Sequence, residues 1–375
     1  MRGYAHTALK KTVCGCCGRV QSGWYDRTVR HARDLSCGDT RVCVEFEMRR
    51  IACRDCGNVK RERLDVLSDN PFYTKRVGFV VGRRCRAASI RDVAREFHLD
   101  WHTVKELDKP YMHAQLDRAG KPAPKVIGID EISIRKGHTY RIVVSDLVRG
   151  RPIWFGGEDR SEASMQPCYE TLSKKKSERI RLAVMDRWKP FRNATNKAAP
   201  QAAILFDKFH IMRHLGEALD KVRKSEYARL QGNDRRFIKG QKYTLLSRKH
   251  NLTSKGRKSL KTLRAASKRL NTAYLRKESF GQMWRDEREG WAQRFFDNWK
   301  DALKWQRLKP YEKFAEMIER HGDGIAAYCK PENNVSLGVV EGLNNKIRVI
   351  QRRAYGLRDE DYLRLKILTC MLPTL

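Results

Sequence analysis

From residue 126 onward, apolar and polar residues follow strand and helix periods in turn. Residues 126–134 form an apolar run of the kind found in buried strands, and two shorter runs follow after turn residues. A helix, a strand, a second helix and a further strand come next, which predicts the order βββαβαβ. The predicted ranges are 126–134, 140–147 and 152–155 for the first three strands, 161–172 and 190–197 for the helices, and 180–185 and 202–206 for the last two strands.

Helical periodicity dominates the remainder of the chain. Residues 72–110 carry apolar positions at helical spacing with a break near 98–100, and residues 208–320 are mainly helical. Two closing helices are predicted at 338–350 and 359–371, whereas 41–48 alternates like a half-exposed strand. A basic connector with two prolines at 120–125 separates the N-terminal part from the rest. The predicted domains are 1–66, 67–120 and 121–375, the last with a helical insertion at about 208–335.

The strongly positive charge of the chain indicates the kind of partner that it binds. The 375 residues hold 79 Lys and Arg against 44 Asp and Glu, which gives a formal net charge of +35, and 41% of them are apolar, as in a folded chain. Residues 221–270 alone hold 17 Lys and Arg against Glu226 and Asp234. An excess of this size favours a polyphosphate partner, because neutralised phosphates release their counterions.

No stretch of the sequence suits export or membrane insertion. The first 11 residues are polar and basic, and the longest apolar patches, such as 77–81, are far shorter than the ~20 residues of a membrane-spanning helix. These features predict a cytoplasmic protein without a membrane partner. In a reducing compartment, clustered cysteines indicate metal binding before disulfides.

Seven of the eleven cysteines lie in the first 56 residues, and four of them form two Cys-x-x-Cys-Gly motifs. Each motif can curl so that two thiolates converge, and two motifs supply the four soft ligands of a structural Zn²⁺ site. The predicted ligands are Cys14, Cys17, Cys53 and Cys56. The alternatives are free buried thiols, or a different ligand set in which Cys16 replaces Cys14 or Cys17, while Cys37 and Cys43 lie on the intervening strands.

Residues 89–107 predict a helix-turn-helix. Ser89 suits the N-cap of a first helix with Asp92 at the capping-box position, and a second helix would begin near Asp100 after a break of a few residues. In such a motif the second helix lies in the major groove of DNA. Its early residues would then face base edges or phosphates, and the alternative is an ordinary helical hairpin. The candidate DNA contacts are Trp101, His102, Thr103 and Lys105.

Three acidic residues stand where strand and helix ends would bring them together. Asp130 lies inside the first predicted strand, Asp186 ends the fourth, and Glu341 lies on the first closing helix. A carboxylate inside an apolar strand is costly to bury without a cation or a proton. A pair of Mg²⁺ ions would offset that cost and would suit an in-line phosphoryl displacement. Any of the three could instead be a salt-bridged core residue or a helix cap.

These acids belong to longer motifs that resemble the insertion-sequence transposases of the ISL-three family. The motifs are Gly-Ile-Asp130-Glu-Ile-Ser-Ile-Arg-Lys-Gly-His, Val-Met-Asp186, Leu-Phe-Asp207-Lys-Phe-His210 and Val-Glu341-Gly-Leu-Asn-Asn-Lys-Ile-Arg, followed by Gln-Arg-Arg-Ala-Tyr-Gly. The cysteine motifs and the helix-turn-helix precede them in the order that the family shows, so the likeness covers nearly the whole chain.

The resemblance implies an α/β (α+β) fold with a ribonuclease-H-like catalytic domain and a helical insertion, behind a zinc-binding module and a helix-turn-helix. It implies an Asp-Asp-Glu triad at Asp130, Asp186 and Glu341 that holds Mg²⁺ or Mn²⁺, two ions in all. The expected activity is metal-dependent cleavage and strand transfer at the inverted-repeat ends of the element, with a second duplex as target. We expect a homo-oligomer, a dimer or larger, working on the bacterial nucleoid.

Further residues are assigned supporting roles by the same resemblance. Asp207 and His210 are expected to support the site, with Asp207 as the alternative second carboxylate and His210 as a possible core residue. Glu131 should point to the opposite face of its strand from Asp130. Basic residues on or next to the Glu341 helix are expected to hold phosphates: Lys346, Arg348, Arg352 and Arg353. Five tryptophans can stack on unpaired bases or pack in cores: Trp188, Trp284, Trp291, Trp299 and Trp305.

Two other classes of function fit parts of the sequence. A zinc and helix-turn-helix repressor would bind DNA without cutting it, so metal-dependent nicking separates it from an enzyme. A nuclease or resolvase of the same fold would cleave but never join, so strand-transfer products separate it from a transposase.

Overall fold

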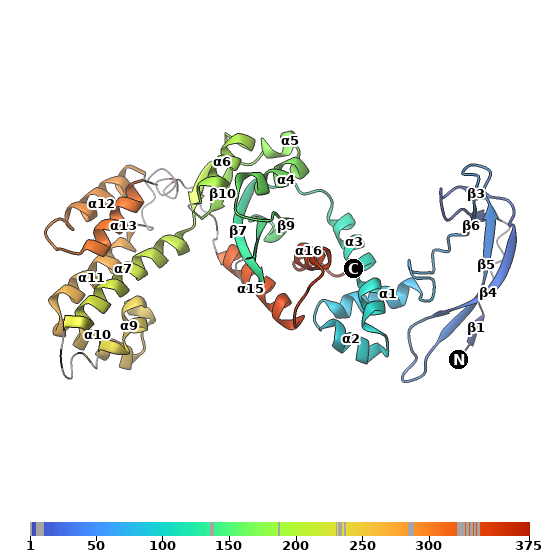
Figure 1. The fold of residues 1–375 in the computed structure, drawn as a ribbon, viewed down its shortest axis with the longest axis horizontal. Coiled ribbons are helices and arrows are strands. Elements are labelled where there is room, and N and C mark those ends of the chain that lie inside the picture. Colours follow the sequence, from blue (N-terminus) through green and yellow to red (C-terminus); the bar gives the residue numbers. More distant parts are fainter. Residues whose placement is uncertain are drawn as a thin grey trace. The chain divides into compact units, whose positions relative to one another are not determined.

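Two compact units make up the structure, a computed structural model shown as a ribbon in Figure 1. One unit contains Met1–Lys121 and Asn345–Leu375, and the other contains Pro122–Asn344. The C-terminal residues thus pack with the N-terminal part, whereas the sequence had suggested that they belong with the 121–375 domain. No helix in the part of the chain described is long and apolar enough to cross a membrane. The structure describes residues 2–4, 11–135, 139–186, 188–229, 231, 235, 238–283, 289–320, 327, 330, 333, 335 and 338–375.

A mixed five-stranded sheet forms the centre of the second unit. The strand order is β11-β10-β7-β8-β9, with β7 in the middle. The β7–β8 and β8–β9 pairs are antiparallel, while β10 runs parallel to both β7 and β11. The strands are β7 (Val126–Arg135), β8 (Thr139–Asp146), β9 (Arg151–Gly156), β10 (Leu182–Met185) and β11 (Ala203–Phe206).

Helices cover both faces of this sheet. On one face, Ile127 and Met185 share a core with residues of α4 (Glu162–Leu172) and α6 (Lys189–Ala198). On the other face, Val126 and Val184 pack with Val340 of α15 (Gly338–Arg353). A Cβ added at Gly128 would lie 3.1 Å from Val340 Cγ2, so glycine permits this close approach of helix and strand. The short helix α5 (Lys174–Ser177) follows α4.

A group of helices follows β11 and builds a core of its own. The long helix α7 contributes Leu215 and Leu219 to this core, where they meet Tyr274 and Phe280 of α11. The helices of this group agree with the helical periodicity of residues 208–320 (Figure 1). Its elements are α7 (Lys208–Arg229), α9 (Lys242–Leu246), the 3-10 helix Lys249–Asn251, α10 (Ser254–Ala266), α11 (Lys268–Phe280), α12 (Glu289–Asp301) and α13 (Lys309–Glu319).

Three helices of the first unit include the two that the periodicity of residues 89–107 predicted, with a short turn between them. They are α1 (Lys75–Cys85), α2 (Ile90–Phe97) and α3 (Trp101–Ala119). The Ser89 side chain caps α2 by accepting from the Asp92 N–H at 3.1 Å, and Asp100 caps α3 by accepting from the His102 N–H at 2.8 Å. His98 takes the left-handed conformation between the helices, with φ 49°, which produces the predicted break.

The C-terminal helix α16 (Glu360–Thr369) packs against α3. Asp108 of α3 is fully buried and accepts from the Tyr362 hydroxyl and from Lys366 Nζ, the latter at 2.5 Å. Met112 of α3 lies in the same small core as Tyr362 and Leu365. A buried charge is tolerated when it is paired in this way, so these contacts join the two ends of the chain into one unit.

A small β module begins the first unit. Its main sheet has the order β1-β5-β4, with β6 also paired to β5, and β2 and β3 form a separate hairpin. The strand expected at 41–48 is the first part of β5. The strands are β1 (Arg2–Tyr4), β2 (Thr12–Val13), β3 (Val20–Gln21), β4 (Asp26–Arg33), β5 (Cys43–Ala52) and β6 (Val59–Arg61).

Two buried glycines of α1 provide a matched test of its packing on α3. A Cβ at Gly82 would overlap the side chain of Tyr111, whereas a Cβ at Gly78 would meet Leu107 Cδ2 at an ordinary 3.8 Å. We expect Gly82→Ala to lower the free energy of unfolding by about 1 to 3 kcal/mol through overpacking. Gly78→Ala should be neutral or stabilise by up to about 1 kcal/mol through helix propensity. Urea denaturation of both variants checks this, and equal effects would contradict it.

Candidate functional site

Three aspartates occupy equivalent positions on three neighbouring strands. Met185 of β10 lies opposite Ile129 of β7 and opposite Phe206 of β11, and an aspartate follows each of these three residues. Neighbouring strands lie about 4.8 Å apart, so the acids share one short stretch of the sheet. This set, the aspartate row, consists of Asp130, Asp186 and Asp207.

The aspartate row lies on the sheet face that α15 covers. Val184 and Leu205, two positions before Asp186 and Asp207, pack in the same core as Val340 of α15. Side chains two positions apart in a strand point to the same face. The ladder also continues one residue beyond β11, because the Asp207 N–H donates to the Met185 carbonyl at 2.9 Å.

Helix α15 reaches this row through Asn344, whose side-chain amide donates to Asp130 Oδ2. Glu341 lies three positions earlier on α15, on the same side of the helix. Asn344 was not among the site residues predicted from the sequence. The available signal was its place within the Val-Glu341-Gly-Leu-Asn-Asn-Lys motif, one helical turn after the acid.

The electrostatics of the row centre on Asp130 and His210. Burial raises the pKa of Asp130, although the Glu131 backbone N–H and the Asn344 amide oppose this shift. His210 Nδ1 lies 3.1 Å from Asp207 Oδ2. That hydrogen bond raises the pKa of His210, and the charges of Asp186, Asp207 and Asp130 raise it further. Asp207 and His210 thus lie within the electrostatic reach of the other two aspartates.

The predicted triad is not drawn into one tight cluster. In the described part of the chain, the only group of three or more His, Cys, Asp and Glu residues whose ligand atoms all lie within 4.8 Å of one another is formed by four cysteines. Glu341 is exposed, while Asp130 and Asp186 are partly buried. The arrangement is therefore open: two aspartates are fixed by the sheet, and Glu341 borders them from a helix.

Glu131 points to the opposite face of β7 from Asp130, as the strand alternation predicted, although the charges of Asp130 and Asp186 still act on it. It forms an ion pair with Arg160, whose guanidinium lies 4.2 Å from the ring centre of Tyr140 and 5.8 Å from that of Trp188. The Trp188 indole N–H donates to the Arg160 carbonyl at 2.7 Å. Trp188 is 44% exposed, so an aromatic surface is held in place two residues after Asp186.

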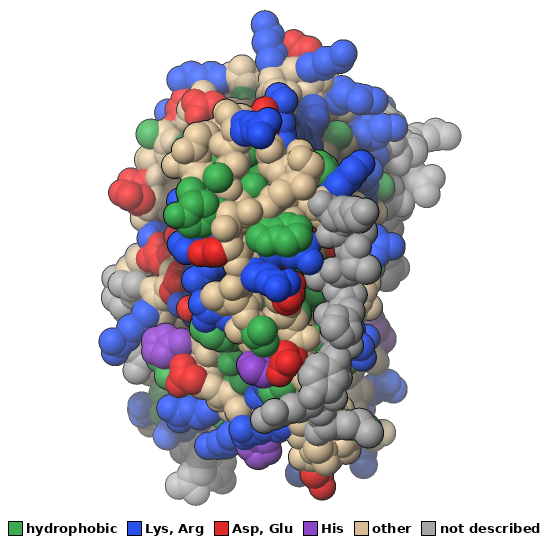
Figure 2. Space-filling model, turned by 90° about the vertical axis from the view of Figure 1, so that its right-hand side faces the viewer, with side chains coloured by type: hydrophobic (Ala, Val, Ile, Leu, Met, Phe, Trp, Pro, Cys, Tyr) green, Lys and Arg blue, Asp and Glu red, His purple; other side chains and the backbone are tan. Residues whose placement is uncertain are grey.

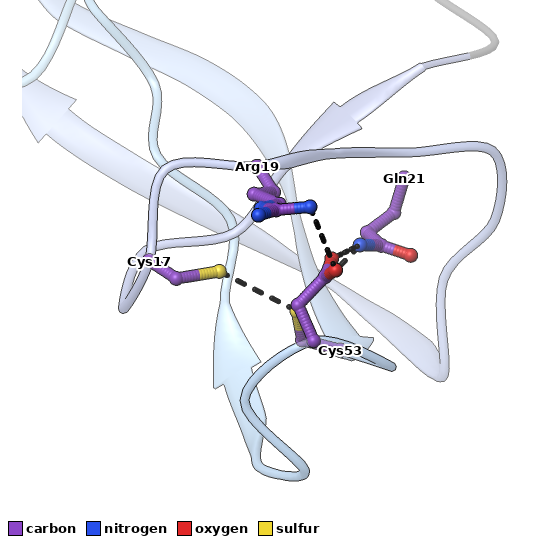
Figure 3. A network of polar contacts seen from close by, with 5 residues as sticks. Cys17, Arg19, Gln21 and Cys53 are labelled. Carbon is purple, nitrogen blue, oxygen red and sulfur yellow. Dashed lines mark hydrogen bonds and ion pairs between the residues drawn. The ribbon is translucent and has the colours of Figure 1, made fainter.

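The four cysteines of the close cluster are Cys14, Cys17, Cys53 and Cys56. Cys17 Sγ lies 3.6 Å from Cys53 Sγ, and Cys14 Sγ lies 3.9 Å from Cys56 Sγ. Tetrahedral zinc with bonds of about 2.3 Å requires Sγ atoms about 3.8 Å apart. The thiols therefore fit such an ion, and neither Cys16 nor Cys37 and Cys43 join them. Figure 3 shows Cys17 and Cys53 facing each other beside Arg19 and Gln21.

Both cysteine motifs fold into the same turn. The Gly18 N–H donates to the Cys14 carbonyl and the Gly57 N–H donates to the Cys53 carbonyl, each at 2.9 Å. Both glycines have positive φ, 72° and 66°, which favours glycine. The backbone N–H groups of Cys17 and Cys16 lower the pKa of the Cys14 thiol to about 7. At Cys17 the Arg19 backbone N–H acts in the same direction, but burial and the thiols of Cys53 and Cys14 outweigh it and raise the pKa to about 12. A bound cation would offset this cost of ionising neighbouring thiols.

Some of the candidate DNA contacts in the first unit are exposed to solvent, and others are bonded to other groups of the protein. Trp101 is 49% exposed and stacks on His102, with ring centres 3.4 Å apart, and Thr103 is partly exposed. Lys105 is instead paired with Asp359 at 2.5 Å. Arg353 is also engaged, because it donates to the carbonyls of Ala87 and Arg86, each at 2.7 Å. Lys346, Arg348 and Arg352 are exposed.

The tryptophans of the helical insertion also differ from one another. Trp299 is buried and packs with Phe280 and Phe314, so it is a core residue. Trp291 and Trp305 are 59% and 90% exposed. Trp284 lies outside the described residues. Lys and Arg side chains are spread over the face of the molecule shown in Figure 2, with acidic side chains among them.

Comparisons with known proteins agree on one class of protein. A sequence model of the ISL-three type, described as a transposase, matches residues 127–367. The transposase for insertion sequence element IS1001 of Bordetella parapertussis is 31% identical over 367 residues, which cover 97% of this chain and 90% of that protein. The transposase for insertion sequence element IS1557 of Mycobacterium tuberculosis is 28% identical, with 92% of this chain and 82% of that protein covered.

Removing the charge of Asp130 should stabilise the metal-free fold. Because burial raises its pKa, the ionised carboxylate opposes folding above the folded-state pKa, and this opposition disappears as the pH falls below the unfolded value of about 3.9. We expect Asp130→Asn to raise the free energy of unfolding by about 1 kcal/mol at pH 7 in EDTA, with a smaller gain toward pH 4. Chemical denaturation at several pH values measures this.

Asp159 provides a control, because replacing it with asparagine should change the free energy of unfolding in the opposite direction. Hydrogen bonds from the side chains of Ser161 and Ser164 lower its pKa to about 2, so its carboxylate stabilises the fold above the unfolded pKa and loses this contribution as the pH falls toward 2. Asp159→Asn should therefore lower stability at pH 7. A loss of stability in Asp130→Asn similar to that in Asp159→Asn would contradict the strained state of Asp130.

Proposed function

The chain belongs to the ISL-three family of transposases, and we propose that it cleaves and joins DNA at the ends of its element with Asp130, Asp186 and Glu341 as ligands of two divalent cations. The observation that carries this assignment is the register of β7 and β10, which aligns Asp130 with Asp186 on the face covered by the Glu341 helix. We further propose a ribonuclease-H-like fold for residues 122–344, supported by the strand order with β7 in the middle.

Carboxylate oxygens are the donors that Mg²⁺ prefers, so the residues present fit such ions. When bound, the cations would activate water and then a 3′-hydroxyl, and would stabilise the attacking and leaving oxygens. The chain itself positions the acids: the sheet fixes two of them, and Asn344 orients Asp130. Glu341, from α15, would complete the set of carboxylates that hold such ions.

Asp207 and His210 are proposed as supporting residues. Asp207 occupies the next position of the aspartate row, and its hydrogen bond to His210 keeps a positive charge available beside the acids. This charge can balance the row before cations bind and can hold a phosphate afterwards. Asp207 remains the alternative second ligand, since it follows Asp186 in the register.

The remaining proposals concern partners. The four-cysteine cluster is proposed to hold a structural Zn²⁺, because its sulfur spacings suit that ion.

The exposed start of α3 is proposed to enter the major groove of the element ends, with Trp101, His102 and Thr103 as contacts. Lys346, Arg348 and Arg352 are proposed to hold phosphates. A homo-oligomer acting on the bacterial nucleoid would bring two ends and a target duplex together.

An in vitro assay with a duplex that carries the element end tests the triad. With Mg²⁺, Asp130→Asn and Glu341→Gln should bind the duplex normally and lose cleavage by more than about 100-fold. Glu131→Gln, on the opposite face, should retain most of its activity, and Asp207→Asn should lose about 10- to 100-fold if it only supports the site. Full nicking by Asp130→Asn would reject the triad.

The same assay separates the classes of function. Absence of nicking by the wild-type protein would favour a repressor, and nicking without joined products would favour a nuclease.

The zinc proposal has a matched pair of neighbours. Cys17 belongs to the four-thiol cluster, whereas Cys16 is exposed and outside it. Elemental analysis should find one zinc per wild-type chain and per Cys16→Ser chain, and less than one in Cys17→Ser. The Cys17→Ser variant should also lose several degrees of melting temperature, because metal binding contributes to folding. Equal zinc content in the two variants would show that the ligand set is different.

A further inference from the structure

The C-terminal end of the chain and the helix-turn-helix form one docked body. Arg353, at the end of α15, donates to two carbonyls at the end of α1, and Lys366 of α16 donates to the Cys85 carbonyl at 3.0 Å. Gln115 of α3 donates to the Pro373 carbonyl at 2.6 Å. These contacts fix the turn between α15 and α16 beside α2 and the start of α3.

A pocket of about 750 Å³ lies between these elements. Its walls come from the first turns of α2, from Trp101 and Lys105 of α3, and from the turn that runs through residues 354–359. The pocket opens beside the exposed first turn of α3, which is the part proposed to meet DNA. Its outer wall is therefore contributed by a segment more than 250 residues away in the sequence.

Two arginines of the pocket are not paired with acidic side chains of the described ranges and can therefore bind an anion. Its two acids are engaged: Asp92 accepts from the Ser89 hydroxyl, and Asp359 is paired with Lys105. Arg91 and Arg358 are exposed, and neither contacts an acidic side chain among the residues that the structure describes. Unpaired guanidinium groups on the wall of a pocket suit a phosphate, which they can bind in a bidentate manner.

Tyr355 gives a second, independent indication of a partner. It is 93% exposed and has φ 51°, a left-handed conformation that is unfavourable for a bulky residue. Gly356 follows with φ 107°. The fold thus holds an aromatic ring in solvent at a backbone position that would suit glycine better. Strain of this kind is found at binding sites, where the surrounding structure maintains it.

We infer that the turn at residues 354–358 is a second DNA-contacting element, which binds the backbone of the same duplex whose major groove receives α3. Arg91 and Arg358 would hold phosphates of one strand, and the Tyr355 ring would pack against the adjacent sugar. The inference rests on the proposed binding of element ends by α3. Duplex DNA is favoured over a small anion because the arginines and both exposed aromatics, Trp101 and Tyr355, line the same open pocket as the first turn of α3.

Two variants test this assignment in the full-length protein. Arg358→Glu should weaken binding to a fluorescein-labelled duplex of the element end by about 10-fold and reduce the dependence of log Kd on log salt by about 1. Tyr355→Gly removes the ring at a position whose backbone favours glycine, so it should weaken binding by several-fold without lowering the melting temperature. Fluorescence anisotropy at a series of salt concentrations measures both.

Arg364 provides the matched control. It is an exposed arginine of α16 that does not line the pocket, so Arg364→Glu makes the same charge change close by in the sequence. An equal loss of affinity in Arg364→Glu and Arg358→Glu, or unchanged binding in both pocket variants, would overturn the inference. The proposed function would stand in either case, provided that the wild-type protein binds and cleaves the end duplex. A wild type that neither binds nor cleaves would instead reject the proposed function.

Discussion

The register of the parallel strands is the constraint on which the rest of this structure depends. Apolar residues of β10 alternate between two buried cores, and in the observed register with β7 each of them faces its own core. A slip by one residue would move every side chain to the wrong face. This packing is what aligns Asp186 with Asp130, and the same logic on β11 brings Asp207 into the row. The position of the acids is therefore a consequence of hydrophobic burial elsewhere in the strands.

The same arrangement stores an electrostatic cost. Three aspartates on adjacent strands repel one another, and burial disfavours the charged form of Asp130. The fold offsets part of this cost with the Asn344 amide and with His210, whose pKa the acids raise. Neither group satisfies the row as fully as a divalent cation would. Under the proposed assignment of these acids to metal binding, this cost is the expected trade between stability and activity.

Local patterns predicted much of this from the sequence. The three-strand meander, the alternation that separates Asp130 from Glu131 and the cap at Ser89 all follow from side chains within a few positions of one another. The contact of Asn344 with Asp130 did not, because it joins residues 214 positions apart. The docking of α16 on α3 was missed for the same reason: the many apolar residues of α16 show that it is largely buried, but not which distant helix covers it.

That docking explains which basic residues remain for DNA. In a chain of net charge +35, composition alone does not distinguish a lysine that binds phosphate from one that holds the fold. Lys105 and Arg353 looked suited to DNA, yet both join the C-terminal segment to the helix-turn-helix. Their engagement positions the turn that presents Tyr355 and Arg358. Basic side chains that are paired within the protein thus hold this surface in place. Basic side chains that have no such partner are the ones available to bind phosphates.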